Sequence, residues 1–120
     1  MKILIIDDEA CFVDTLTQRL KLRGYEVAGF CKAAQGLKAL DEQGFDIALL
    51  DISMPEMDGM ETLQIIHQNH PDLPVILLTG HATLETASRG KELGAWDYLL
   101  KPVPLDELTS RIEEAAGPRS

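Results

Sequence analysis

The sequence predicts an α/β domain, in which five parallel strands and five helices form a doubly wound open sheet. Two observations lead to this prediction. Short apolar runs alternate along the chain with longer segments that have the period of an amphipathic helix. Three of these runs, within residues 2–7, 46–51 and 74–79, are almost continuously apolar, which is typical of strands covered on both faces. Parallel strands need crossover helices of a single hand, so we expect helices on both faces of the sheet.

The first two strand–helix units are expected before residue 45. KILIID (2–7) is predicted as the first strand, and YEVAGF (25–30), with alternating apolar positions, as the second. The helices expected over 10–23 and 33–43 are each followed by a glycine, a residue common just after a helix ends. Each helix has an apolar stripe: Val13, Leu16 and Leu20 in the first, and Ala33, Leu37 and Leu40 in the second.

The third and fourth units follow the same pattern. DIALLD (46–51) and PVILLT (74–79) are the expected strands, and the expected helices cover 58–69 and 83–93. Prolines follow the first of these helices and Gly94 follows the second, as expected at helix ends. Their predicted buried stripes are Met60, Leu63 and Ile66 in the first, and Leu84, Ala87 and Leu93 in the second.

The fifth unit completes the predicted domain. WDYLLK (96–101) is the last expected strand. The helix expected over 105–116 has the clearest amphipathic stripe in the chain, formed by Leu105, Leu108, Ile112 and Ala115. We therefore expect one domain over residues 1–116, with 117–120 as a tail or the start of a linker.

Composition limits the function. The 120 residues suffice for one domain with a core of its own, and the net charge is −9. That charge argues against direct binding to nucleic acid or to an anionic membrane. No apolar stretch approaches the roughly 20 residues that cross a bilayer, and no signal peptide is evident, so we expect a cytoplasmic protein. Cys11 and Cys31 fit no metal-binding spacing and are expected to be buried thiols, not a disulfide.

Polar side chains stand at the carboxyl ends of the predicted strands, where ligands bind in open parallel sheets. Four of the five strands end on them: Asp7 with Asp8, Asp51, Thr79 and Lys101. In a sheet ordered 2-1-3-4-5 the strand order reverses between strands one and three, so their acids face one crevice. If two carboxylates lie about 5 Å apart at an effective dielectric constant near 20, the repulsion between their charges is roughly 3 kcal/mol. Protons or a divalent cation must offset this repulsion.

The chemistry of these groups favours magnesium and phosphate. The charged ligands are all oxygens, which suits Mg²⁺ better than zinc, and Mg²⁺ commonly shares carboxylates with waters and a phosphate oxygen. Lys101 can pair with a phosphoryl oxygen, the Thr79 hydroxyl can donate to another, and Gly80 leaves room for a ligand near the backbone. Asp51 can act as a nucleophile and form an aspartyl phosphate.

Each residue taken alone also has a structural interpretation. Asp7 and Asp8 could cap the first helix, and Asp51 could form the turn before PEMDG. Thr79 could start a helix, and Lys101 could be a solvated lysine. The functional interpretation depends on all of them meeting at one edge of the sheet.

Together these residues resemble the receiver domain of bacterial two-component response regulators. The resemblance covers about residues 2–116 and rests on IIDDE, LLDISMPEMDGME, PVILLTG and GAWDYLLKP, in this order. It implies the flavodoxin-like strand order 2-1-3-4-5. It also implies a role for each site residue: Asp51 as phosphoacceptor; Asp7, Asp8, Asp51 and the Ser53 carbonyl as Mg²⁺ ligands; Lys101 and Thr79 beside the phosphoryl group; Thr79 and Tyr98 as a switch pair; Gly80, His81 and Pro102 in the site loops.

The resemblance implies a signalling switch that modifies only itself, and not a turnover enzyme. A sensor histidine kinase or a phosphotransfer protein would donate the phosphoryl group from a phosphohistidine. Phosphorylation would change the surface of residues 83–93, 96–101 and 105–116, which would control an output domain, a partner or a second copy. The Lys101–Pro102 peptide bond is expected to be cis, as in the family.

Three other functions fit the predicted fold. A phosphatase with an aspartyl nucleophile needs a second acid two residues later, where this chain has Ser53. A flavin-binding electron carrier needs a hydroxyl-rich loop after the first strand, where this chain has DDEACF. A receiver used only for docking would usually lack an acid or the lysine, and none is missing here.

Overall fold

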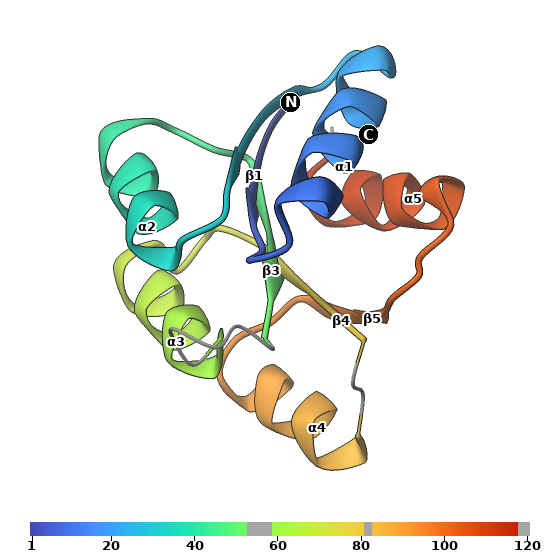
Figure 1. The fold of residues 1–120 in the computed structure, drawn as a ribbon. Coiled ribbons are helices and arrows are strands. Elements are labelled where there is room, and N and C mark those ends of the chain that lie inside the picture. Colours follow the sequence, from blue (N-terminus) through green and yellow to red (C-terminus); the bar gives the residue numbers. More distant parts are fainter. Residues whose placement is uncertain (53–58, 81–82, 118–120) are drawn as a thin grey trace.

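The computed structural model describes residues 1–52, 59–80 and 83–117. Its strands are β1 (Lys2–Ile6), β2 (Glu26–Phe30), β3 (Ile47–Asp51), β4 (Val75–Thr79) and β5 (Asp97–Leu100). Its helices are α1 (Ala10–Leu22), α2 (Ala33–Glu42), α3 (Gly59–Asn69), α4 (Leu84–Glu92) and α5 (Leu105–Ala116). Strands and helices alternate along the chain as predicted, and their ends lie within about one residue of the predicted ends (Figure 1).

The five strands form one parallel sheet in the predicted order, β2-β1-β3-β4-β5. Ile6 pairs with Leu50 across β1 and β3, so these two strands end at nearly the same level. Both lie in the interior of the sheet, and every residue of β3 and β4 is buried. This burial accounts for the nearly continuous apolar runs of the two strands.

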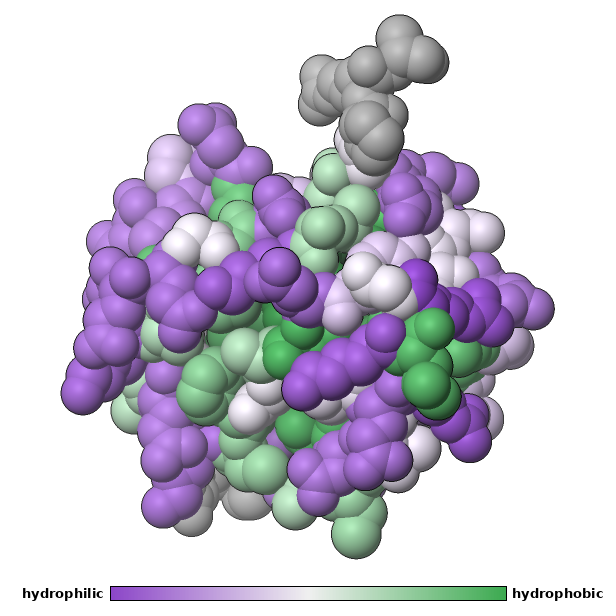
Figure 2. Space-filling view, turned by 90° about the horizontal axis from the view of Figure 1, so that it is seen from above, coloured by the Kyte–Doolittle hydropathy of each residue, from purple (hydrophilic) through white to green (hydrophobic). Residues whose placement is uncertain are grey.

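Helices cover both faces of the sheet (Figure 1). One apolar core lies under α1 and α5, where Leu20 and Ile112 are fully buried. The other lies under α2 and α3, with Leu63 and Ile66 fully buried, and α4 lies on the same side. Seen from above, hydrophilic residues make up much of the outer surface, and apolar residues are visible between them (Figure 2). None of the described helices is long and apolar enough to span a membrane.

Two details of the prediction are wrong. Leu84 was expected in the buried stripe of its helix, but it is 87% exposed, and the buried residue of α4 is Gly90. The cysteines are free thiols as predicted, but they are not buried: Cys11 is exposed and Cys31 is half-buried. The Lys101–Pro102 bond is cis, as the resemblance implies.

Candidate functional site

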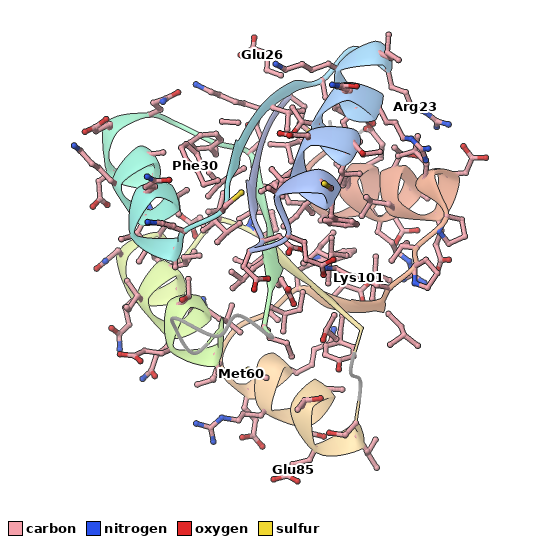
Figure 3. All side chains as sticks on the ribbon, in the orientation of Figure 1. Arg23, Glu26, Phe30, Met60, Glu85 and Lys101 are labelled. Carbon is pink, nitrogen blue, oxygen red and sulfur yellow. The ribbon has the colours of Figure 1, made fainter. Side chains whose placement is uncertain are left out.

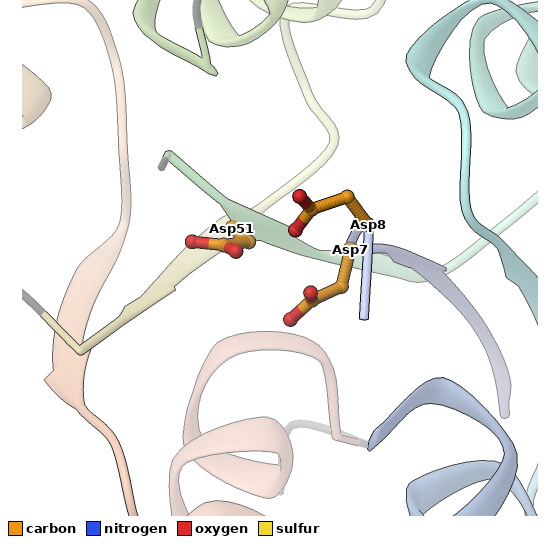
Figure 4. A group of neighbouring side chains, drawn as sticks. All are labelled: Asp7, Asp8 and Asp51. Atoms are coloured by element: carbon orange, nitrogen blue, oxygen red, sulfur yellow. The ribbon is translucent and has the colours of Figure 1, made fainter. Parts of the chain in front are cut away.

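Three carboxylates meet where β1 and β3 end (Figure 4). Asp7 and Asp8 follow β1, and Asp51 is the last residue of β3. One oxygen from each carboxylate lies within 4.8 Å of the other two. Asp7 and Asp51 are only 1% and 4% exposed, whereas Asp8 faces solvent. The group is therefore a partly buried cluster of oxygen ligands that opens to water on the side of Asp8.

Local backbone contacts fix the position of Asp7. Its N–H donates to the carbonyl of Phe30 at 3.1 Å, which extends the β1–β2 pairing by one residue. Its Oδ1 accepts from the N–H of Glu9 at 3.0 Å, just before α1 begins. The cap residue of α1 is Glu9, and its side chain makes no capping hydrogen bond. The simple alternative, in which Asp7 and Asp8 are the helix cap, therefore does not describe this end of α1.

Lys101 inserts its ammonium group among the acids. Nζ lies 2.5 Å from Asp7 Oδ2, 3.6 Å from Asp51 Oδ2 and 3.4 Å from Glu9 Oε1. Nζ also lies over the ring of Phe12, 4.2 Å from its centre. The side chain is 13% exposed and lies near the ends of β1 and β3 in Figure 3. The lysine is therefore part of the acidic cluster and not a solvated surface group.

Burial and charge act against each other in this cluster. Burial raises the pKa of the Asp7 carboxyl, and nearby Asp51 adds to this, although the hydrogen bonds from Lys101 and from the Glu9 N–H lower it. Burial acts to lower the pKa of Lys101, but the hydrogen bond to Asp7 and the charges of the three acids outweigh it and raise that pKa. The Lys101 ammonium therefore does not fully offset the cost of burying the negative charge of Asp7.

The acids fit a magnesium ion. All the ligand atoms that they offer are carboxylate oxygens, which hard divalent cations prefer. The raised pKa of Asp7 indicates that further positive charge would stabilise its ionised form. Asp7, Asp8 and Asp51 would hold the ion, and Asp8 would leave room for waters. Ser53, the fourth expected ligand, lies outside the described residues, as does His81 of the site loop.

The predicted switch residues lie on β4 and β5. Thr79 ends β4, is fully buried and accepts at its carbonyl from the Lys101 N–H at 2.7 Å. Tyr98 pairs with Leu77 across the two strands, and its ring is half-buried against the core. Its hydroxyl lies 3.0 Å from Thr86 Oγ1 in α4. Gly80 is exposed, and a Cβ placed on it would meet no atom of the described chain within 4 Å.

Sequence reasoning missed two contacts around these residues. Phe12 lies under Lys101, but it stands beside the apolar stripe of α1, and no pattern indicates a ring at that position. Thr86 reaches Tyr98 across 12 positions, and only the packing of α4 brings the two hydroxyls together.

The comparisons with known proteins concern the sequence and the fold of the chain. A family model described as the response regulator receiver domain matches residues 3–113. The transcriptional regulatory protein ZraR of Escherichia coli is 39% identical over 113 residues, which are 94% of this chain. A response regulator receiver domain protein from Clostridium thermocellum is 35% identical, with a TM-score of 0.90 over 96% of this chain and 93% of that one.

A response regulator from Burkholderia pseudomallei, solved with a phosphorylated aspartic acid, a calcium ion and citrate, is 28% identical with a TM-score of 0.89. The match covers 96% of this chain and 68% of that one. The chain spans about a quarter of the length of ZraR, since the match covers 26% of it.

Proposed function

The chain belongs to the family of response regulator receiver domains, and on this premise we propose that Asp51 accepts a phosphoryl group with the help of Mg²⁺. The family implies phosphorylation-dependent switching in signal transduction, and homologues of this chain are transcriptional regulators. The observation that carries the proposal is the cluster itself: three carboxylates within 4.8 Å of one another, with the Lys101 ammonium among them.

Asp51 is suited to the role of nucleophile. It is held at the end of an interior strand, and Lys101 Nζ lies 3.6 Å from its Oδ2. In the proposed reaction, an Asp51 oxygen attacks phosphorus, a new O–P bond forms, and the bond from phosphorus to the donor nitrogen breaks. The electron pair of that bond stays with the donor, which takes up a proton. A sensor histidine kinase or a phosphotransfer protein would supply the phosphohistidine.

Metal and lysine share the charge of the transferred group. Mg²⁺, when bound, would offset negative charge on the phosphoryl oxygens. Asp7 and Asp8 would hold the ion, with Asp51 and the Ser53 carbonyl as further ligands. Lys101 would exchange part of its contact with Asp7 for a phosphoryl oxygen, because its flexible side chain can move the ammonium within the cluster. The chain would thereby catalyse its own phosphorylation and dephosphorylation, without turnover of a separate substrate.

Thr79 and Tyr98 would transmit the event to the surface. A hydrogen bond from Thr79 to the charged group contributes roughly 1.5–3 kcal/mol. Moving a two-state equilibrium from 1:99 to 99:1 takes about 5.5 kcal/mol, so Thr79 cannot supply the whole bias. Lys101, the metal and the repacking of Tyr98 would supply the rest. If Thr79→Ala responds to phosphorylation as fully as the unchanged protein, this account of the switch is wrong.

The output surface would be α4, β5 and α5. Trp96 precedes β5 and is 38% exposed, and Leu100 at its end is 55% exposed, so this side presents apolar groups that a partner could cover. An output domain, a separate partner or a second copy would bind there. We propose residues 1–116 as the receiver domain, supported by the end of α5 at Ala116, with 117–120 as a tail or linker.

A mass measurement tests the proposal. The protein is incubated with Mg²⁺ and phosphoramidate and its intact mass is recorded. We expect a gain of about 80 Da, the mass of one phosphoryl group, that needs Mg²⁺ and is absent in Asp51→Asn. Asp72→Asn, which changes an exposed acid far along the chain from the cluster, is the matched control and should gain the same mass. Absence of any gain would favour a receiver used only for docking, and continuous release of phosphate from organic monoesters would favour a phosphatase.

A further inference from the structure

Within the described chain, α4 approaches the sheet at one buried glycine and makes polar contacts on either side of it. Of its nine residues only Gly90 is buried. A Cβ on Gly90 would lie 2.6 Å from Leu77 Cδ1, so the helix approaches the sheet closely at that one point. On the C-terminal side of this point Lys91 Nζ donates to the Trp96 carbonyl at 2.8 Å. At the other end the contact is the hydroxyl pair of Thr86 and Tyr98, 3.0 Å apart.

Thr86 also takes part in the N-terminal cap of α4. Its Oγ1 accepts from the N–H of Thr83 at 3.1 Å and donates to the Thr83 carbonyl at 3.0 Å. The Thr86 N–H in turn donates to Thr83 Oγ1, which completes a capping box. Thr83 Oγ1 also lies 3.2 Å from Thr86 Oγ1. The Thr86 hydroxyl is therefore shared between the groups of Thr83 and the Tyr98 hydroxyl, and either oxygen can be the donor in the Thr86–Tyr98 pair.

We propose that Thr86 is a positioning residue that couples the Tyr98 hydroxyl to the first turn of α4. Thr86 Oγ1 contacts both the helix cap and the Tyr98 hydroxyl, so we expect loss of the tyrosine contact to change the bonds that start the helix. Gly90 is the one buried residue of α4, so little of the helix is anchored in the core. The pair at the site, Thr79 and Tyr98, thus continues through a third hydroxyl into the surface helix. This consequence for signalling rests on the proposed function, whereas the coupling itself does not.

Amide hydrogen exchange without any phosphoryl donor tests the coupling. The reporter is the Ala87 N–H, which donates to the Thr83 carbonyl at 3.1 Å in the first turn. Tyr98→Phe leaves every group of the cap in place, yet we expect it to speed exchange about fivefold, the effect of losing one hydrogen bond. Thr86→Val should speed exchange further, and the double variant should match Thr86→Val alone, because the Tyr98 hydroxyl has then lost its contact with α4.

Two outcomes would overturn the proposal. One is an unchanged Ala87 exchange rate in Tyr98→Phe, and the other is a double variant whose effect is the product of the single effects. Thr86→Ser keeps the hydroxyl and should stay within about twofold of the unchanged protein. If Thr86→Val loses the helix altogether, Tyr98→Phe and Thr86→Ser still decide between coupling and simple capping.

The signalling consequence has its own readout. Trp96 is the only tryptophan in the sequence, and its carbonyl is bonded to α4, so its fluorescence reports on this region. After phosphoramidate and Mg²⁺, Thr86→Val should gain the phosphoryl mass in full but lose at least half of the Trp96 signal change, and Thr86→Ser should retain it. A full signal in Thr86→Val overturns the signalling consequence. If no variant gains the mass, the proposed function fails while the exchange result stands.

Discussion

Replacing Lys101 by methionine should destabilise the folded domain in metal-free buffer. The lysine side chain is 13% exposed, and those of Asp7 and Asp51 are 2% and 4% exposed, so the substitution leaves two buried carboxylates without their cation. At an effective dielectric constant near 20, the 3.6 Å between Nζ and Asp51 corresponds to an attraction of about 5 kcal/mol. Desolvation of the lysine offsets part of this attraction, and removing one partner of a buried ion pair costs about 3–5 kcal/mol.

The assay is thermal unfolding at neutral pH, with and without Mg²⁺. A loss of about 3 kcal/mol lowers the midpoint of a domain of this size by about 10 °C. Mg²⁺ should recover part of the loss, because the ion replaces positive charge in the cluster. Acid should also reduce the difference in unfolding midpoint between Lys101→Met and the unchanged protein, because protonated carboxyls no longer repel one another.

Lys38→Met is the matched control. Lys38 is 77% exposed and faces Glu42 at 3.9 Å, a surface pair worth at most about 0.5 kcal/mol. If Lys101→Met unfolds at the same temperature as Lys38→Met in metal-free buffer, the lysine does not neutralise the cluster. A loss that is the same with Mg²⁺ as without it would contradict the assignment of the acids as metal ligands.

Three further predictions concern the fold and the titration of the site. Thr17→Val should raise the free energy of unfolding by about 1 kcal/mol in a urea titration, because Thr17 Oγ1 is buried without a hydrogen bond in the described chain. Gly59→Ala should lower it by about 2 kcal/mol, since its Cβ would lie 2.2 Å from the Ile52 Cα, whereas Gly44→Ala, with no atom within 4 Å, should change it little. The pKa of Asp7 is raised above 3.8, so the folded state binds this proton more tightly than the unfolded state does. Without metal, the free energy of unfolding should therefore fall as the pH rises through that pKa. The affinity for Mg²⁺, measured by calorimetry, should rise over the same pH range.

The fold follows from the sequence because local and long-range signals agree. In β3 and β4 all residues are buried, so the apolar runs mark the strands almost to the residue. The prediction failed at Leu84, where helical spacing suggested a buried face. Spacing alone cannot show that Gly90 is the point of closest approach, since that depends on how α4 lies across Leu77.

The acidic cluster was also predictable, since parallel strands bring their carboxyl ends to one edge. Asp7, Asp8 and Asp51 meet for that reason, and the register of β1 with β3 sets their separation. The contacts of Phe12 and Thr86 were not predictable, because they depend on the rotation and height of α1 and α4 above the sheet.

The most direct test of the central claim is to locate the modified residue. After incubation with Mg²⁺ and phosphoramidate, borohydride reduces an aspartyl phosphate to homoserine, which tandem mass spectrometry of the digested protein can find. We predict homoserine at position 51 and at no other acid, and none when Mg²⁺ is removed by a chelator. Homoserine at another acid, or its absence in protein that has gained the phosphoryl mass, would contradict the role of Asp51 as phosphoacceptor.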